Sequence, residues 1–392
     1  MSRPVVFYGN NPSNIYMEAM FKLLNEGKEL APRGKRIKEL RPVTIGYADP
    51  RKRLTFLSGR VINPFFQLSE SFWIVTGGSD VAFLTPYNAS IAQFSDDGKY
   101  FNAPYGERLR HWGKNDARGY IHCPIDQLDD VYRKLHADRD SRQAVAFIGN
   151  PEFDNSKYTL KGGKDIACNL NIKFKIREGK LDINVDNRSN DLHWGTFGAN
   201  LCQFSTIQEL MASWLGVEIG EYFQVTDSLH IYLDEYGAKE TEKVLNAYGR
   251  SIEDAWPLPH VEEYYFDNEP RMTFGKVRFQ DLSMHFYEEI QPKLNEDYTY
   301  NSRNEYHELL HEIGCYEDRY WRMTFQAMFV KQAHNRGAFE PLIEALYEME
   351  DSSWKVSCLR FLSKRYSEEK AFKSVYKHLD DDIRNYIERK GE

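Results

Sequence analysis

Apolar and polar residues alternate along the chain with two different periods. Four stretches carry apolar residues at helical spacing, and these are 14–26, 64–84 with a break at Gly77-Gly78, 126–136 and 201–215. Between 144 and 186, and again between 219 and 233, apolar and polar residues alternate one by one, as in strands. A REGK turn inside the first stretch predicts a hairpin, with Ile172, Phe174 and Ile176 on one face.

Beyond about residue 300 the spacing is helical to the end of the sequence. We therefore predict a mixed α/β (α+β) domain over 1–265, a connecting segment over 266–300 and an all-helical extension over 301–392. The extension carries four aromatic residues that form either its core or a docking surface for a partner protein, namely Tyr320, Trp321, Phe325 and Phe329.

Composition places the chain among globular proteins. It has 392 residues, of which 41% are hydrophobic and 28% charged, so two or three folded units can form. No run of about 18 apolar residues occurs and the start lacks the apolar core of a signal peptide, which predicts a cytoplasmic protein without a membrane span. The net charge of -8 disfavours direct nucleic-acid binding, but a local basic cluster can still hold a phosphate.

The cysteines argue against a disulfide framework and against a thiolate zinc site. There are five, an odd number, and no two have CxxC spacing. One of them can instead serve as a nucleophile. They are Cys123, Cys168, Cys202, Cys315 and Cys358.

An HExxH pattern, from His307 to His311, lies in a predicted helix and could bind zinc with Glu308 as base. In an acidic chain with this many histidines the pattern arises by chance in roughly one of forty sequences. Glu340 or Glu344 could supply a third ligand, but a solvated helix face is the simpler interpretation. We predict no metal site.

A longer series of motifs is spread over about two hundred residues. In order they are Arg33, LSESFW with Glu70 and Trp73, FSDDG at 94–98, APYGERLR at 103–110 with Tyr105, DSR at 140–142, Cys168, RSND at 188–191, Asn200, and DSLHIY at 227–232. This order resembles the thymidylate synthase superfamily over about residues 15–235. Within it, FSDDG and the ERLR motif are most similar to the pyrimidine hydroxymethylase branch, and the long chain resembles the deoxyuridylate hydroxymethylases of bacteriophages.

The resemblance implies that Cys168 is a nucleophile. A thiolate that adds to C6 of a pyrimidine makes C5 nucleophilic, and C5 then attacks the methylene of the co-substrate 5,10-methylenetetrahydrofolate. Nearby arginines would favour the thiolate. Cys202 is the rival thiol, but it lies in an apolar helical stretch and is expected in the core.

The resemblance also implies a site for a nucleoside monophosphate. Its phosphate would be bound by Arg33, Arg188 and Ser189 of one subunit and by Arg142 of the second subunit of a homodimer. The family commonly has two adjacent arginines where this chain has Arg142 followed by glutamine. Either Arg139 substitutes for the second arginine or one phosphate contact is lost.

Asn200 is expected to select the base, because an amide can pair with both N3–H and O4 of uracil. This assignment requires one extra residue after Gly195, and without it Ala199 would take the position. His230 and Tyr232 lie two apart on a predicted strand, hence on one face, and resemble the pair that binds the deoxyribose 3'-hydroxyl.

The remaining implied roles concern the folate and the protons. Asp191 would bind the pterin and take part in catalysis, Trp73 would line the folate site, Glu70 would order water and help proton movement, and Tyr105 would be catalytic.

The last step decides the product. An exocyclic methylene is left on the ring: hydride converts it to thymidylate, whereas water gives the 5-hydroxymethyl pyrimidine. Where synthases have tryptophans that exclude water, this chain has Ile91 and Phe94. A long extension also follows the domain, unlike in the synthases. We therefore expect 5-hydroxymethyl-dUMP and tetrahydrofolate as products. A dCMP hydroxymethylase and a thymidylate synthase are the alternatives.

Overall fold

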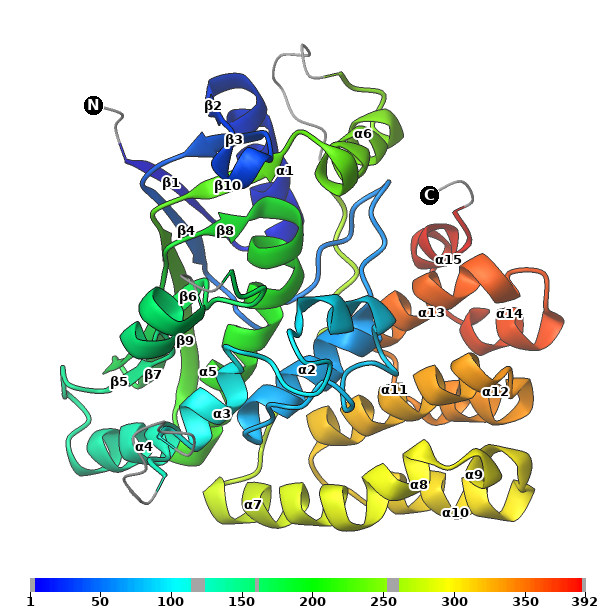
Figure 1. Cartoon of the computed structure of the whole chain (residues 1–392). Helices are drawn as coiled ribbons and strands as arrows, with labels where there is room; N and C mark the ends of the chain where they lie inside the picture. Colours follow the sequence, from blue (N-terminus) through cyan, green and yellow to red (C-terminus); the bar gives the residue numbers. More distant parts are fainter. Residues whose placement is uncertain (1–3, 114–123, 159–161, 252–260, 390–392) are drawn as a thin grey trace.

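The computed structural model describes residues 4–113, 124–158, 162–251 and 261–389, and it contains a mixed six-stranded sheet (Figure 1). The central hairpin joins antiparallel strands through Glu178 and Gly179, both with positive φ, as two-residue hairpin turns require. This confirms the predicted hairpin. In sheet order the strands are β1 (Val5–Gly9), β4 (Val43–Tyr47), β9 (Glu218–Thr226), β7 (Lys180–Asn187), β6 (Asn169–Arg177) and β5 (Val145–Phe147).

A smaller four-stranded sheet lies beside the first. Its strand β10 runs parallel to β8, in a register that sets His230 opposite Asp191. In sheet order its strands are β2 (Lys28–Leu30), β3 (Ile37–Leu40), β10 (Leu229–Tyr232) and β8 (Asn190–Asp191).

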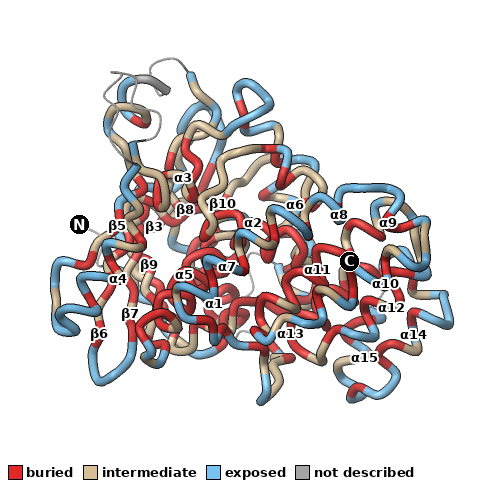
Figure 2. The backbone as a smooth tube through the Cα atoms, turned by 90° about the horizontal axis from the view of Figure 1, so that it is seen from below, coloured by how far each residue is buried: buried red, intermediate tan, exposed pale blue. Residues whose placement is uncertain are grey.

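Helices cover one face of the larger sheet. Helix α5 (Leu201–Leu215) is buried along almost its whole length because it lies between the sheet and α2 (Pro64–Val75), as Figures 1 and 2 show. Together with α1 (Pro12–Glu26) and α4 (Gln127–Ala137), these are the four helices that the apolar spacing predicts.

The prediction for the second helix was too long. Helix α2 ends at Val75, and residues 81–87 form turns instead of continuing it. Gly77 has a φ of +90°, which ends the helix, and α3 (Tyr105–Arg110) packs against this end.

Short helical segments complete the mixed domain. They are α6 (Glu235–Ala247), the 3-10 turns Pro32–Gly34 and Ala89–Phe94, and the π-helical segments Pro151–Tyr158 and Leu192–Asn200.

The C-terminal part of the chain is all helical, which confirms the predicted fold class. It begins at Lys276, inside the segment that the sequence analysis assigned to a connection. Its elements are α7 (Lys276–His285), a π-helical turn (Phe286–Ile290), α8 (Gln291–Asn295), α9 (Asp297–Asn301), α10 (Arg303–Gly314), α11 (Arg319–Arg336), α12 (Phe339–Glu348), α13 (Ser353–Tyr366), α14 (Lys370–Tyr376) and α15 (Asp381–Glu388). Within the described residues, no helix combines the length and apolarity needed to cross a membrane.

The C-terminal helices share a core with the mixed domain. The ring of Phe72 on α2 lies 4.6 Å from that of Phe286, 5.4 Å from Trp321 and 5.1 Å from Phe325, measured between centroids. Tyr320 and Phe329 are buried as well. The four aromatic residues of the extension are therefore core and not a docking surface.

Candidate active site

Cys168 directly precedes β6 and lies beside Arg188, which follows the neighbouring strand β7. The Arg188 backbone N–H donates to the Cys168 carbonyl at 2.9 Å, and its Nη2 lies 3.7 Å from the thiol sulfur. Two further bonds, to the carbonyls of Ala167 and Ile166 at 2.7 and 3.0 Å, hold the guanidinium in place. Pairing of the two strand ends thus sets a fixed positive charge against the sulfur.

The thiol is subject to opposing influences. The pKa of Cys168 is raised overall, chiefly by burial and also by Asp165 and Asp191. The charges of Arg188 and Arg33 oppose this rise. The two arginines supply the positive potential that a thiolate needs here.

Arg33 reaches the same site from the other sheet. It occupies a turn with a φ of +53°, and its guanidinium donates to the Tyr232 hydroxyl. The ring of Tyr232 packs edge-on against His230 at 5.2 Å, so these two side chains share a face as their spacing predicts. The structure therefore gathers Arg33, Arg188, Cys168 and Tyr232 around one position.

Asn200 lies at the centre of a buried amide network. Its Oδ1 accepts from Asn169 at 3.2 Å and its Nδ2 donates to Asn190 at 3.0 Å. It ends the π-helical segment Leu192–Asn200, a helix type that accommodates extra residues relative to an α-helix. Asn200 is buried, whereas Ala199, which would take this position without the extra residue, is only half-buried.

Tyr105 joins this network through Asn169, the residue after Cys168. Its hydroxyl accepts from Asn169 Nδ2 at 2.9 Å, and burial together with the nearby Cys168 raises its pKa. The next residue, Gly106, lies so close to the end of α2 that a Cβ there would be 2.7 Å from the Gly78 nitrogen. This close approach holds α3, and with it Tyr105, against α2.

Glu70 projects from α2 toward α5. Gln203 Nε2 donates to its Oε2 at 2.6 Å, and burial raises the pKa of Glu70 to about 7. The carboxyl group can therefore gain or lose a proton near neutral pH. Gln203 was not predicted as a site residue. It lies three positions after Asn200 in a stretch of helical spacing, and this indicates that the two side chains share one face of the helix.

Asp191 presents a carboxylate oxygen without a partner. One oxygen accepts from the Trp194 backbone N–H, while the buried Oδ2 has no hydrogen-bond partner among the described residues. Trp194, which the sequence analysis did not identify, is 41% exposed. A large exposed aromatic residue three positions after the aspartate was the signal for it.

Trp73 lies on α2 and packs against residues that follow this helix. Its side chain is buried, its Nε1 lies 3.4 Å from Asp80 Oδ2, and its ring packs edge-on against Phe101. Of the two residues compared with the tryptophans of synthases, Ile91 is buried and Phe94 is 40% exposed.

The structure does not bring every residue of the series into the cluster. Arg142 is exposed and lies near Lys175 of β6. Arg139 donates to the Leu215 carbonyl at 3.4 Å, so its side chain is directed to the end of α5. Ser189 follows Arg188 and is half-buried.

The other sulfur and histidine candidates lie elsewhere. Cys202 is buried 3.4 Å from the Ser71 hydroxyl, and burial raises its pKa to about 11, in keeping with a core thiol. Cys123 lies outside the described residues. His307 pairs with Glu344 at 3.3 Å and His311 lies 3.6 Å from Cys315, and in the described part of the chain no group of three potential ligands could hold a metal.

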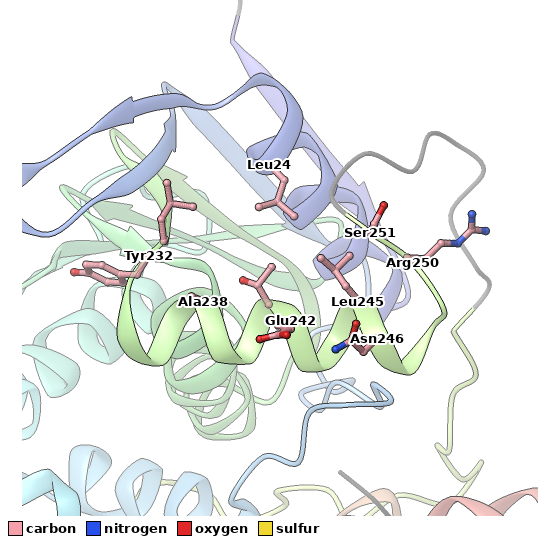
Figure 3. A pocket seen from close by; sticks show the side chains of 10 residues that line it. Leu24, Tyr232, Ala238, Glu242, Leu245, Asn246, Arg250 and Ser251 are labelled. Carbon is pink, nitrogen blue, oxygen red and sulfur yellow. The ribbon is translucent and has the colours of Figure 1, made fainter.

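A pocket of about 350 Å³ adjoins the cluster at Tyr232. Figure 3 shows its lining side chains along α6, with Leu24 of α1 facing them. The pocket is not lined by Cys168, Arg33 or Arg188. It therefore lies next to the cluster of these residues and does not enclose it.

Comparison with known proteins adds to this geometry. Residues 14–297 match the thymidylate synthase family. A deoxyuridylate hydroxymethyltransferase of Bacillus phage SP01 is 49% identical over 385 residues, which cover 98% of this chain and 99% of that protein. Proteins of the same name from Pseudomonas phage M6 and Delftia phage PhiW-14 are 37% and 33% identical over 217 and 226 residues, or 55% and 56% of this chain and 58% of each relative.

Proposed function

This chain belongs to the thymidylate synthase family, and from that premise we propose that it acts as a deoxyuridylate hydroxymethyltransferase. It places a one-carbon unit on C5 of dUMP and adds water, which gives 5-hydroxymethyl-dUMP. The observation that carries the proposal is the similarity to the phage SP01 protein, because it extends over 98% of the chain and so includes both the site and the C-terminal helices.

Cys168 starts the reaction by adding to C6 of the pyrimidine. The guanidinium of Arg188, 3.7 Å from the sulfur, stabilises the thiolate, and we assign it a second role in binding the substrate phosphate. Arg33 and Ser189 complete the phosphate contacts within one subunit. Because Arg139 is directed to Leu215, we propose that the second arginine contact of the family is lost in this chain.

Asn200 selects uracil. Its bonds to Asn169 and Asn190 fix the orientation of the amide, so that its second N–H and the remaining lone pair of its oxygen can pair with O4 and N3–H of uracil. The hydroxyl of Tyr232 and the ring of His230 lie beside the arginines, where they can meet the deoxyribose.

The residues present also fit the folate co-substrate. 5,10-Methylenetetrahydrofolate supplies the one-carbon unit. The unpartnered, buried Oδ2 of Asp191 is an acceptor for the ring N–H groups of a pterin, and the exposed indole of Trp194 is a surface on which its rings can stack. Trp73 would back this site.

The open face of the six-stranded sheet supports a homodimer. On it, β1 exposes Val6 by 66% and Tyr8 by 53%, and the Tyr8 ring stacks on Phe223 of β9. An exposed, partly apolar sheet face of this kind is a surface for a second copy of the chain. Arg142 lies near Lys175 of β6. Phe174 and Ile176, on either side of Lys175, are buried on the helix-covered face, so Lys175 and Arg142 lie on the open face, where Arg142 can reach the site of a partner subunit.

The test is the mass of the product. The protein is incubated with 5,10-methylenetetrahydrofolate and either dUMP or dCMP, and the nucleotide is identified by mass spectrometry. We expect 5-hydroxymethyl-dUMP from dUMP and little turnover of dCMP. Thymidylate as product, or preferential conversion of dCMP, would replace the proposal by one of its two alternatives.

A further inference from the structure

Glu70 and Gln203 form a pair at the contact of α2 and α5. Gln203 is 6% exposed, and its Nε2 donates to Glu70 Oε2 at 2.6 Å. Asn200, three residues before Gln203, has helical backbone angles and leads directly into α5, so both amides lie on one face of a continuous helical run. The pair therefore adjoins the residue proposed to hold the base.

The amide of Gln203 is only half satisfied. Its Oε1 is buried and has no hydrogen-bond partner among the described residues. Gln67, one turn before Glu70 on α2, is 5% exposed, and its Oε1 also lacks a hydrogen-bond partner in the described part of the chain. Leaving buried carbonyl oxygens unpaired is costly, and a polar position with several such groups is where proteins bind water.

The distance between the free carbonyl oxygen and the carboxylate is limited by covalent geometry. Oε1 and Nε2 of Gln203 share one carbon, so the carbonyl oxygen lies within the reach of a single water molecule from Glu70. A water there can donate one hydrogen to Gln203 and the other to Glu70, which leaves an oxygen lone pair free to attack.

Resting on the proposed function, we propose that Gln203 is a positioning residue that holds, together with Glu70, the water molecule that hydroxylates the one-carbon unit on C5. The water oxygen bonds to the exocyclic methylene carbon and one water proton passes to the Glu70 carboxylate. The π electrons of the methylene move through C5 onto O4 as an enolate, which then expels the Cys168 sulfur from C6 and restores the ring double bond.

Two steps of the proposed reaction can be timed individually: transfer of the one-carbon unit to C5, and the addition of water. In a single turnover with C5-tritiated dUMP, loss of tritium reports the steps before water addition, and 5-hydroxymethyl-dUMP reports water addition itself. For Gln203→Met we expect tritium loss within about threefold of wild type, while the hydroxymethyl product forms roughly 10- to 100-fold more slowly. The KM for dUMP should stay close to that of wild type.

Two further variants keep the test decisive. Gln203→Glu preserves the side-chain volume, so if the Met variant does not fold, the same split between the two rates is expected there. Gln208 is the matched control: it lies on α5, is fully buried, has an unpartnered Oε1 and donates to the carbonyls of Leu181 and Glu221, away from Glu70. Gln208→Met should slow neither step selectively.

The outcomes distinguish this inference from the function on which it rests. Wild-type protein that loses tritium without forming the hydroxymethyl product overturns both. If wild-type protein forms the hydroxymethyl product, three results overturn the role of Gln203 alone. They are equal slowing of both steps in the Gln203 variants, no slowing of either step, and a selective slowing of water addition in Gln208→Met as well.

Discussion

Cys168 is the side chain whose removal should have the largest effect on the chemistry. We expect Cys168→Ser to abolish tritium release from C5-labelled dUMP while leaving nucleotide binding intact, because a hydroxyl is too weak a nucleophile to add to C6. Cys202→Ser is the control, since that thiol is buried against Ser71. The assignment is wrong if the Cys168 variant releases tritium and the Cys202 variant does not.

Glu70 should set the acidic limb of the pH profile. Burial raises the pKa of Glu70 to about 7 in the free protein, and the carboxylate must be ionised to accept a proton. The rate should therefore fall as pH decreases through this value, by about tenfold per pH unit well below it. Glu70→Gln should lose this limb together with most of the activity. A wild-type limb near the ordinary glutamate pKa would contradict the assignment.

Asn200→Asp should move the preference from dUMP toward dCMP. An ionised carboxylate has no donor for O4 of uracil but accepts well from the cytosine amino group. Because an unpaired buried group costs about 1–3 kcal/mol, the ratio of kcat/KM values should change by roughly ten- to a hundredfold. An unchanged ratio would mean that Asn200 does not face the base.

At the scale of elements, α11 should contribute to the stability of the catalytic domain. Phe325 is fully buried, and its ring lies 5.1 Å from that of Phe72 on α2, the helix that carries Glu70. We expect Phe325→Ala to lower the free energy of unfolding by about 3–5 kcal/mol in a single transition. Calorimetry measures this, with the exposed Tyr298→Ala as control. Two separate transitions, of which only one shifts, would show that the C-terminal helices unfold independently.

Charge also joins the segment between β4 and α2 to helices α5 and α11. Arg53 and Glu209 form a buried ion pair, and the Arg53 guanidinium lies over the ring of Tyr320 on α11 at 5.0 Å. Glu209 also pairs with Arg51 at 3.1 Å, and removing Glu209 would leave the buried Arg53 without this carboxylate partner. Residues of the mixed domain and of the C-terminal helices are thus joined by charge as well as by apolar packing.

At the scale of the whole molecule, the proposed dimer predicts complementation between inactive variants. If Arg142 reaches the partner's site, a heterodimer of Cys168→Ser and Arg142→Ala chains has one site with both residues intact. Mixing and refolding equal amounts should restore about a quarter of wild-type activity by random pairing. Activity is measured before and after refolding. No recovery in a dimer that forms normally would place Arg142 in its own subunit's site or outside any site.

The amino-acid sequence by itself predicted several of the helices and strands, and the order of the motifs, but not strands β1 to β4. Helices α1, α4 and α5 and the β6–β7 hairpin follow from apolar spacing, which depends only on local backbone geometry. The order from Arg33 to Tyr232 was sufficient to indicate the family. The prediction for α2 was too long, because the helix ends at Val75, just before Gly77 with its positive φ.

Only the tertiary structure decided which side chains meet. Gln203 bonds to Glu70 across 133 positions, and Arg33 reaches Tyr232 because β3 and β10 pair in one sheet. The aromatic residues of α11 became core, not surface, through contact with Phe72. A sequence pattern states which face of an element is apolar but not what covers that face, because the partner is chosen by packing of the whole chain.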